Sequence, residues 1–292
     1  MNLKPNSKVL IQGITEPLSS TYAARMKGYG TNVVAGISPG YGGQMLHDIP
    51  VFDLVEQALS VVGPVDTTML FVPPYQALDA ALEAVAAGIQ QLVIISDGMP
   101  PLDMVHLLRK VEATETLVVG PNSAGIIVPG KILLGTHASE FYTPGPVGIL
   151  SSSTLTYEIA LELTKSGVGQ SISVSIGSDA ITGSSFLQWL QILDEDESTQ
   201  AIVLVGEPGS KNEEAAARYI AEAIDKPVIA YVAGRHAPAG KRWGHTSTLA
   251  AVVGRADIDT AQSKLAAFKE ANIPIAELPS QIPELVKNAL KK

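Results

Sequence analysis

The amino-acid sequence predicts an α/β protein built from two Rossmann-like or flavodoxin-like parallel-sheet domains in tandem. Short β-branched runs alternate with longer Ala-, Leu- and Glu-rich segments, as in a parallel sheet covered by helices on both faces. The 292 residues suffice for about two domains of ~150 residues. The alternation also restarts after a Gly-, Pro- and Thr-containing connection at 130–145, so we predict domains at 1–130 and 131–292.

In the first half, buried strands are expected wherever a short aliphatic run is bounded by turn residues. Glycines and prolines mark many of the boundaries, including Gly30, Gly88 and the pair Pro73 and Pro74. The expected strands are 8–12, 32–36, 68–72, 91–95 and 116–119, and the expected helices are 21–29, 54–62, 76–87 and 101–110.

The second half repeats this rhythm with little local sequence in common, which argues against a solenoid-type repeat. The run at 170–176 is a strand candidate despite its many polar residues. The expected strands are 147–150, 170–176, 201–205 and 227–232, and the expected helices are 155–165, 186–193, 212–224, 260–271 and 282–290.

Composition excludes several classes of function. A net charge of −9 argues against a nucleic-acid partner, because such binding needs clustered Lys and Arg. The sequence has no cysteine and no histidine pair at metal-ligand spacing, so no disulfide and no metal site is predicted. No apolar run reaches the roughly 18 residues that span a membrane, and we expect a cytoplasmic protein with no membrane partner.

Candidate binding loops follow the strands of the first half. Ligands of open parallel sheets lie at the carboxyl ends of the strands, where glycines and helix N-termini suit anions such as pyrophosphate. There is no complete Gly-x-Gly-x-x-Gly motif and no Walker A motif, and each loop alone is explained by tight turns. Together they favour a nucleotide-type ligand; the loops are 12–17, 36–43, 73–74, 96–100 and 120–125.

The second half offers a candidate catalytic pair, His245 and Glu207. His245 lies in a glycine-containing loop after a predicted strand, and Glu207 directly follows the preceding strand. A histidine can carry a phosphoryl group when a carboxylate orients its ring and donors hold the phosphate. A solvated loop histidine is the alternative for His245 taken alone.

These motifs resemble the α subunit of succinyl-CoA synthetase over nearly the whole chain. The resemblance rests on ordered matches at 12–15, 34–40, 71–73, 120–122, 154–158, 205–207, 237–242 and 244–245. It implies that the first domain binds coenzyme A and that the second is a ligase domain. The implied coenzyme A residues are Thr15, Ser38, Pro39, Val72, Pro73 and Asn122, with Gly13, Tyr41 and Asp97 as further candidates on the same loops.

The resemblance also implies a mechanism and a partner. His245 would become a phosphohistidine supported by Glu207, and Ser152, Ser153 and Thr154 would hold the phosphate. The phosphoryl group would pass from NTP through His245 to a small carboxylic acid, and the resulting acyl phosphate would react with the thiol of coenzyme A. NTP and Mg would bind a β-type subunit with an ATP-grasp domain.

Several site loops depart from the family pattern. Pro-Gly-Lys-Gly of the family reads Pro-Gly-Tyr41-Gly here, Glu16 enters the first loop, and the turn at 151–154 lacks the family's arginine. An acidic side chain beside phosphates is repulsive. These changes leave an alternative open: a non-catalytic paralogue that keeps the fold and binds a nucleotide-type ligand or a partner subunit in regulation or assembly.

Overall fold

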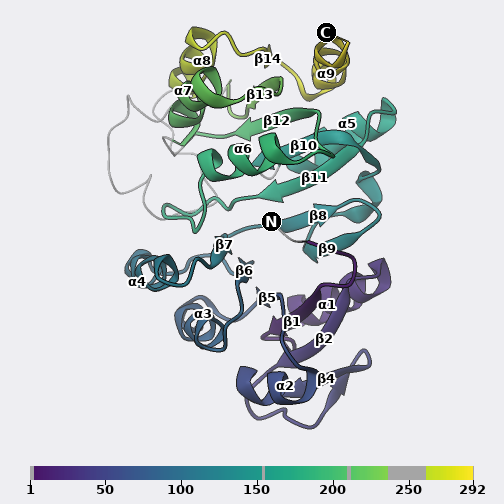
Figure 1. The fold of residues 1–292 in the computed structure, drawn as a ribbon, viewed down its shortest axis with the longest axis vertical. Coiled ribbons are helices and arrows are strands. Elements are labelled where there is room, and N and C mark those ends of the chain that lie inside the picture. The colour runs from purple at the N-terminus through teal and green to yellow at the C-terminus, as the bar shows by residue number, and fades with distance from the viewer. Residues whose placement is uncertain (1–2, 153–154, 209–211, 236–260, 292) are drawn as a thin grey trace. The chain divides into compact units, whose positions relative to one another are not determined.

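The computed structural model describes residues 3–152, 155–208, 212–235 and 261–291. The chain forms two compact units, Met1–His137 with Ile181–Gly183, and Ala138–Ala180 with Ser184–Lys292. Each is a mostly parallel sheet with helices on its faces, which confirms the predicted fold class (Figure 1). The division predicted between residues 130 and 131 stays a prediction.

The sheet of the first unit has the strand order β3-β4-β2-β1-β5-β6-β7. All neighbouring strands are parallel except β3 and β4. Because β1, β2, β5, β6 and β7 are parallel, the loops that follow them all lie at one edge of the sheet. The strands are β1 (Lys8–Gln12), β2 (Asn32–Ile37), β3 (Met45–Leu46), β4 (Ile49–Phe52), β5 (Thr67–Leu70), β6 (Gln91–Ile94) and β7 (Leu117–Val119).

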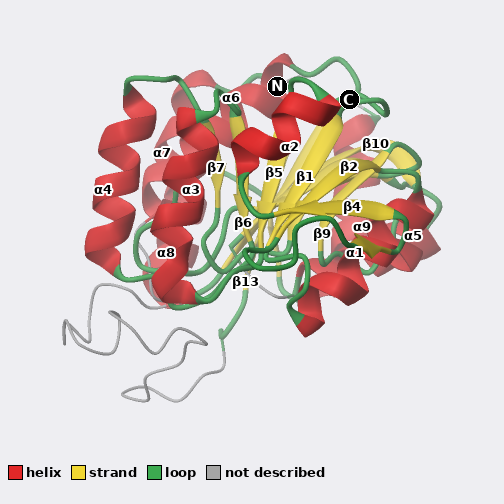
Figure 2. Ribbon diagram, turned by 90° about the horizontal axis from the view of Figure 1, so that it is seen from below, coloured by secondary structure: helices red, strands yellow, loops and turns green. Residues whose placement is uncertain are grey.

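One large core of the first unit lies between its sheet and three helices, α2 (Val55–Val62), α3 (Ala77–Ala86) and α4 (Pro101–Glu112). Figure 2 shows α3 and α4 side by side. Alanines on α3, including Ala81, give this helix close packing against strand residues such as Leu92. The apolar periodicity of the sequence placed these helices to within a few residues.

Helix α1 (Pro17–Tyr29) begins four residues before the predicted start. Pro17 occupies the first helical position, where its fixed φ suits a helix and its missing N–H is no loss. The helix ends at Gly30, whose φ of 102° allows its N–H and that of Thr31 to reach carbonyls of the last turn.

Two antiparallel hairpins were not predicted. In β3–β4 the two turn residues, His47 and Asp48, have φ of 51° and 57°, the backbone of a tight hairpin turn without its usual Asn-Gly or Asp-Gly sequence. The second hairpin is β8 (Gly125–Val128) with β9 (Ile132–Gly135). Strand β9 lies within the predicted connection at 130–145, whereas β8 starts at the end of the predicted loop 120–125. Gly125 and Gly135 face each other in its register, and such glycines resemble a loop in the sequence.

In the second unit, the strands β10 to β14 are parallel and run in the order β14-β13-β12-β10-β11. The polar strand β11 is buried throughout. Its polar side chains form hydrogen bonds: Gln170 Nε2 donates to Ala160 O at 3.0 Å, and Ser171 Oγ lies 2.7 Å from Thr199 Oγ1. The bounds are β10 (Pro144–Ser151), β11 (Gln170–Ser175), β12 (Ala201–Gly206), β13 (Val228–Val232) and β14 (Ile275–Ala276).

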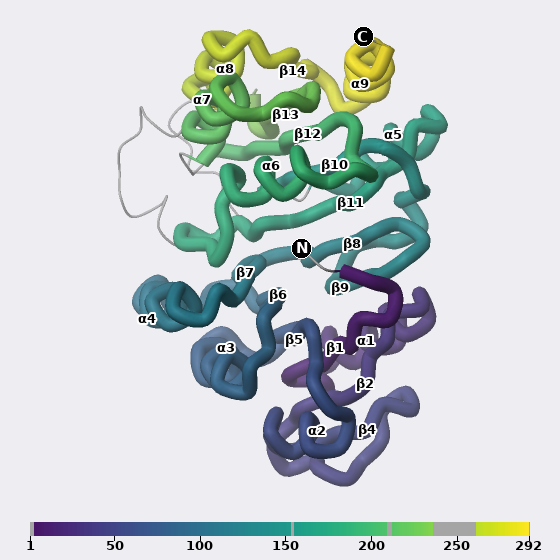
Figure 3. The backbone as a smooth tube through the Cα atoms, viewed as in Figure 1, coloured from purple at the N-terminus to yellow at the C-terminus, as the bar shows by residue number. Residues whose placement is uncertain are grey.

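The helices of the second unit form two groups, one for each face of the sheet. Helix α5 (Thr156–Lys165) packs with α9 (Ile282–Leu290), and Figure 3 shows the two side by side. The other group is α6 (Phe186–Glu195), α7 (Asn212–Ala223) and α8 (Ala261–Glu270). None of the helices in the described ranges has the length and apolarity to cross a membrane.

Candidate functional site

The first candidate loop leaves β1 at Gly13, where glycine is required. Gly13 has a φ of 75°, and a Cβ there would lie 3.0 Å from the backbone nitrogen of Val72. Its own N–H donates to Ile37 O at 2.8 Å. The loops after β1, β2 and β5 therefore meet around this residue.

Hydroxyls join the first two loops. Thr15 Oγ1 and Ser38 Oγ lie 2.6 Å apart, and the Ser38 N–H donates to Phe52 O at 2.9 Å. Beyond Ser38 and Pro39 the chain turns through glycines, and Asp53 Oδ1 accepts from the N–H groups of Gly40 and Gly42 at 2.7 and 3.0 Å. The exposed Tyr41 ring lies between these two anchored glycines.

The loops after β5, β6 and β7 are joined in the same way. Ser96 Oγ donates to Val72 O, and the Asn122 N–H donates to Ser96 O at 2.8 Å. Asn122 has a φ of 55°, which asparagine tolerates better than most residues. The structure thus links Gly13, Val72 and Asn122, while Pro73 and Asp97 are exposed on the same loops.

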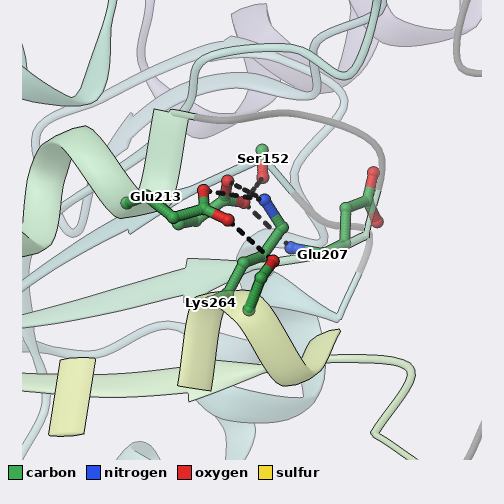
Figure 4. Close-up of polar contacts among 6 residues, drawn as sticks. Ser152, Glu207, Glu213 and Lys264 are labelled. Carbon is green, nitrogen blue, oxygen red and sulfur yellow. Dashed lines mark hydrogen bonds and ion pairs between the residues drawn. The ribbon is translucent and has the colours of Figure 1, made fainter. Parts of the chain in front are cut away.

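In the second unit, Glu207 directly follows β12, as predicted from the sequence. Its N–H donates to Glu213 Oε1 at 3.1 Å, and the Ser152 hydroxyl donates to the same oxygen at 3.5 Å (Figure 4). Glu213 Oε2 lies 2.7 Å from Lys264 Nζ, and both side chains are fully buried. The candidate residues Glu207 and Ser152 therefore share one buried carboxylate.

Gly206 leaves the room for this carboxylate. A Cβ on Gly206 would lie 2.6 Å from Glu213 Cγ and 2.7 Å from its Oε1. A larger residue at the end of β12 would displace Glu213 from its hydrogen bonds. Glycine at this position is therefore needed for the contact between α7 and the Glu207 backbone.

Three predicted site residues, His245, Ser153 and Thr154, lie outside the described residues. The proximity of His245 to Glu207 therefore stays a prediction. The strand preceding the His245 segment, β13, is nevertheless paired in parallel with β12, as the prediction required.

The three histidines within the described residues, His47, His106 and His137, lie outside the proposed phosphoryl-transfer loops. His137 is fully buried, and desolvation lowers its pKa to about 4, although its bond to Gly125 O at 3.0 Å acts in the opposite direction. His106 is exposed on α4, and His47 Nε2 lies 3.1 Å from Ser20 Oγ. The described ranges hold no group of acidic and histidine side chains that could bind a metal ion.

Sequence reasoning did not identify Asp53, Ser96, Glu213 or Lys264. Asp53 follows β4, a strand that was itself missed, and Ser96 lies in a recognised loop but acts through its hydroxyl. Glu213 and Lys264 are 51 residues apart, and in the sequence both look like ordinary surface residues of helices. The one local signal was the Gly at 206, which precedes a predicted catalytic residue.

Matches to two family models define the class of protein. The model described as a CoA binding domain matches residues 4–98, and the one described as CoA-ligase matches residues 149–273. The chain belongs to the family of succinate–CoA ligase α subunits, which confirms the predicted resemblance. It is 42% identical over 285 residues to succinate–CoA ligase [ADP-forming] subunit alpha 2 of Archaeoglobus fulgidus, with 97% of each chain covered.

Two further relatives are also similar to this chain over nearly their whole length. Succinate–CoA ligase [ADP-forming] subunit alpha of Aquifex aeolicus is 41% identical, covering 98% of this chain and 93% of that protein. Malate–CoA ligase subunit alpha of Methylorubrum extorquens is 40% identical, covering 97% and 96%.

Solved structures support the fold. ATP citrate lyase from Methanothrix soehngenii, in complex with citrate and coenzyme A, superposes with a TM-score of 0.87 at 21% identity. All of this chain is covered, and it spans 50% of the length of that one.

Proposed function

We propose that this CoA-ligase α subunit joins a small carboxylic acid to coenzyme A, with NTP hydrolysis and with His245 as the carrier of the phosphoryl group. The observation that carries the proposal is the similarity to ligase α subunits over 97% of the chain. The relatives reported above have enzyme names, and none of them favours the non-catalytic paralogue. The departures at Glu16, Tyr41 and residues 151–154 would then adjust binding without abolishing the reaction.

The first unit would bind coenzyme A along its linked strand ends. Gly13 lets the backbone approach a ligand closely, and the hydroxyls of Thr15 and Ser38 can donate to phosphate oxygens. The exposed ring of Tyr41 offers a flat apolar surface on the same rim, suited to stacking on an adenine base. Pro39, Val72, Pro73, Asp97 and Asn122 complete the proposed set.

The second unit would carry the phosphoryl chemistry. His245 would attack the terminal phosphate of NTP through a ring nitrogen and displace NDP, and Glu207 would orient the ring by accepting from its other nitrogen. The phosphoryl group would then move to the carboxylate of the acid. The coenzyme A thiol supplies the nucleophile that converts the acyl phosphate to the thioester and releases phosphate. Ser152, Ser153 and Thr154 would hold the phosphoryl oxygens.

A partner subunit follows from this scheme. The relatives are named as α subunits, and we propose a β-type subunit whose ATP-grasp domain binds NTP and Mg. The small acid completes the reactants, with succinate and malate as the first candidates because the relatives are named for them. The cytoplasm is the proposed compartment.

The test is phosphorylation of His245 in the complex reconstituted with the β subunit. We expect radiolabelled NTP to give an acid-labile label on the α chain that is absent in His245→Asn. Succinate or malate added with coenzyme A should discharge the label. A competent β subunit that leaves His245 unlabelled would contradict the catalytic proposal.

A further inference from the structure

Glu213 and Lys264 form a buried ion pair beneath the loops assigned to phosphoryl transfer. Both side chains are 0% exposed, and Nζ and Oε2 are 2.7 Å apart. Removing two charges from water is costly, and apolar residues of similar volume often give equal or greater stability. Stability alone therefore does not account for a pair at this position.

The second oxygen of Glu213 holds two loops. Oε1 accepts from the Glu207 N–H at 3.1 Å and from the Ser152 hydroxyl at 3.5 Å. These residues follow β12 and β10, which are neighbouring parallel strands. One carboxylate thus sets the backbone at the proposed histidine-orienting residue and the hydroxyl of a proposed phosphate-binding residue.

Lys264 links the same carboxylate to the chain that follows His245. It lies in the first turn of α8, which begins at Ala261, and it also contacts Glu214 Oε2 at 3.4 Å. Glu214 in turn accepts from Ser263 Oγ at 2.8 Å, and within the described residues its carboxylate bonds to α8 through Ser263 and Lys264. Among these acidic residues, only Glu213 connects α8 to both loops within the described chain.

We propose that Glu213 and Lys264 are a positioning pair for phosphoryl transfer. Glu213 fixes the Glu207 backbone and the Ser152 hydroxyl, and Lys264 fixes the Glu213 carboxylate. Figure 4 shows the Glu207 side chain directed away from the pair, so the pair acts on the Glu207 backbone. Because both side chains are fully buried, we assign them a positioning role and not a catalytic one. This inference rests on the proposed function of Glu207 and Ser152.

Paired variants separate positioning from folding. A single substitution would leave the other residue of the pair as an uncompensated buried charge, which destabilises the fold by itself. Glu213→Met with Lys264→Met removes both charges and the acceptor for the Glu207 N–H. Glu213→Gln with Lys264→Met also removes both charges but keeps an amide oxygen as acceptor. We expect His245 labelling and kcat to fall about 10- to 100-fold in the first variant and to recover largely in the second, at similar thermal midpoints. The KM for coenzyme A should stay unchanged in both.

Glu214→Gln is the matched control, since it changes an acidic partner of the same lysine and leaves the Glu207 bond intact. We expect near-normal labelling. Labelling at the normal rate in the double Met variant, or an equal loss in Glu214→Gln, would overturn the positioning role.

Amide hydrogen exchange separates this inference from the proposed function. The Glu207 amide should exchange faster in the double Met variant and stay protected in the Gln variant. If the parent complex gives no His245 label, the proposed function fails, and the exchange of this amide alone decides whether the pair holds the loop. Unchanged protection of Glu207 in the double Met variant would overturn the inference.

Discussion

Single residues in this protein are constrained by the space and charge around them. Gly13 and Gly206 stand at the ends of β1 and β12, and each lacks room for a side chain, against Val72 and Glu213 respectively. Because both strand ends lead into proposed binding loops, even a methyl group would move site backbone. His137 is constrained differently, by burial of a group that can become charged.

His137 should make stability depend on pH. Its pKa is about 4 in the folded protein and 6.5 in a solvated histidine, so the unfolded chain binds the proton first as pH falls. Stability is then fully present above pH ~6.5 and declines toward pH ~4, by roughly 3 kcal/mol in total. Urea unfolding of the protein should show this loss as a fall in the free energy of unfolding of the first unit.

His137→Gln is the control, because its amide can still donate to Gly125 O and does not titrate. We expect the variant to lose stability more gradually between pH 7 and pH 4. An equally steep decline would assign the acid sensitivity to other groups.

At the scale of elements, the hairpin β3–β4 serves the proposed coenzyme A site. It carries Asp53 immediately after β4, and Asp53 Oδ1 binds the N–H groups of Gly40 and Gly42. A Cβ on Gly42 would lie 2.5 Å from Asp53 Oδ2, so the glycine permits this close contact. The hairpin thereby shapes the loop on which Tyr41 is exposed.

Asp53→Ala should loosen this loop. Losing an acceptor for two N–H groups releases the chain around Tyr41, and we expect the KM for coenzyme A to rise by about 10-fold with little change in kcat. Steady-state kinetics of the reconstituted complex provide the measurement. Asp53→Asn keeps an acceptor oxygen and should stay near the parent value, whereas an unchanged KM in Asp53→Ala would separate this loop from coenzyme A binding.

At the scale of the whole molecule, each unit has its own set of parallel strands, its own buried residues and its own proposed share of the chemistry. The first unit would bind coenzyme A and the second would carry the phosphoryl group. A ligand that binds one folded unit stabilises it by mass action, by ~2.7 kcal/mol at 100 times its Kd. The two roles can therefore be separated by where ligand changes amide exchange.

Coenzyme A should slow amide exchange mainly in β1, β2 and β5, with less effect in β10, β12 and β13. At saturating ligand we expect slowing of up to about 100-fold for the most protected amides of the first unit. Thr15→Val with Ser38→Ala removes the hydroxyl pair and should weaken this protection. Protection that is strongest in the second unit would contradict the assignment of coenzyme A to the first.

Local sequence patterns were sufficient to predict the main helices and strands and to identify the family. Aliphatic runs, helix periodicity and Gly or Pro boundaries depend on near neighbours, so the sequence alone determined β1, β2, β6 and β12 to within one residue at each end. It also indicated the loops at 12–17 and 36–43 through their position after strands, and the family resemblance then implied Thr15 and Ser38 within them. The two hairpins were not predicted, because His47 and Asp48 lack a hairpin-turn signature and because Gly125 and Gly135 resemble loop residues.

Only the tertiary structure decided how the strand ends are fastened together. The bonds from Asp53 to the glycine loop and from Ser96 to Val72 join segments that no local pattern pairs. Glu213 and Lys264 are charged residues on separate helices, and their burial together follows from the order of β10, β12 and β13. Sequence determines what each element is because that depends on its neighbours in the chain, whereas the contacts that shape the sites exist only after distant elements have packed.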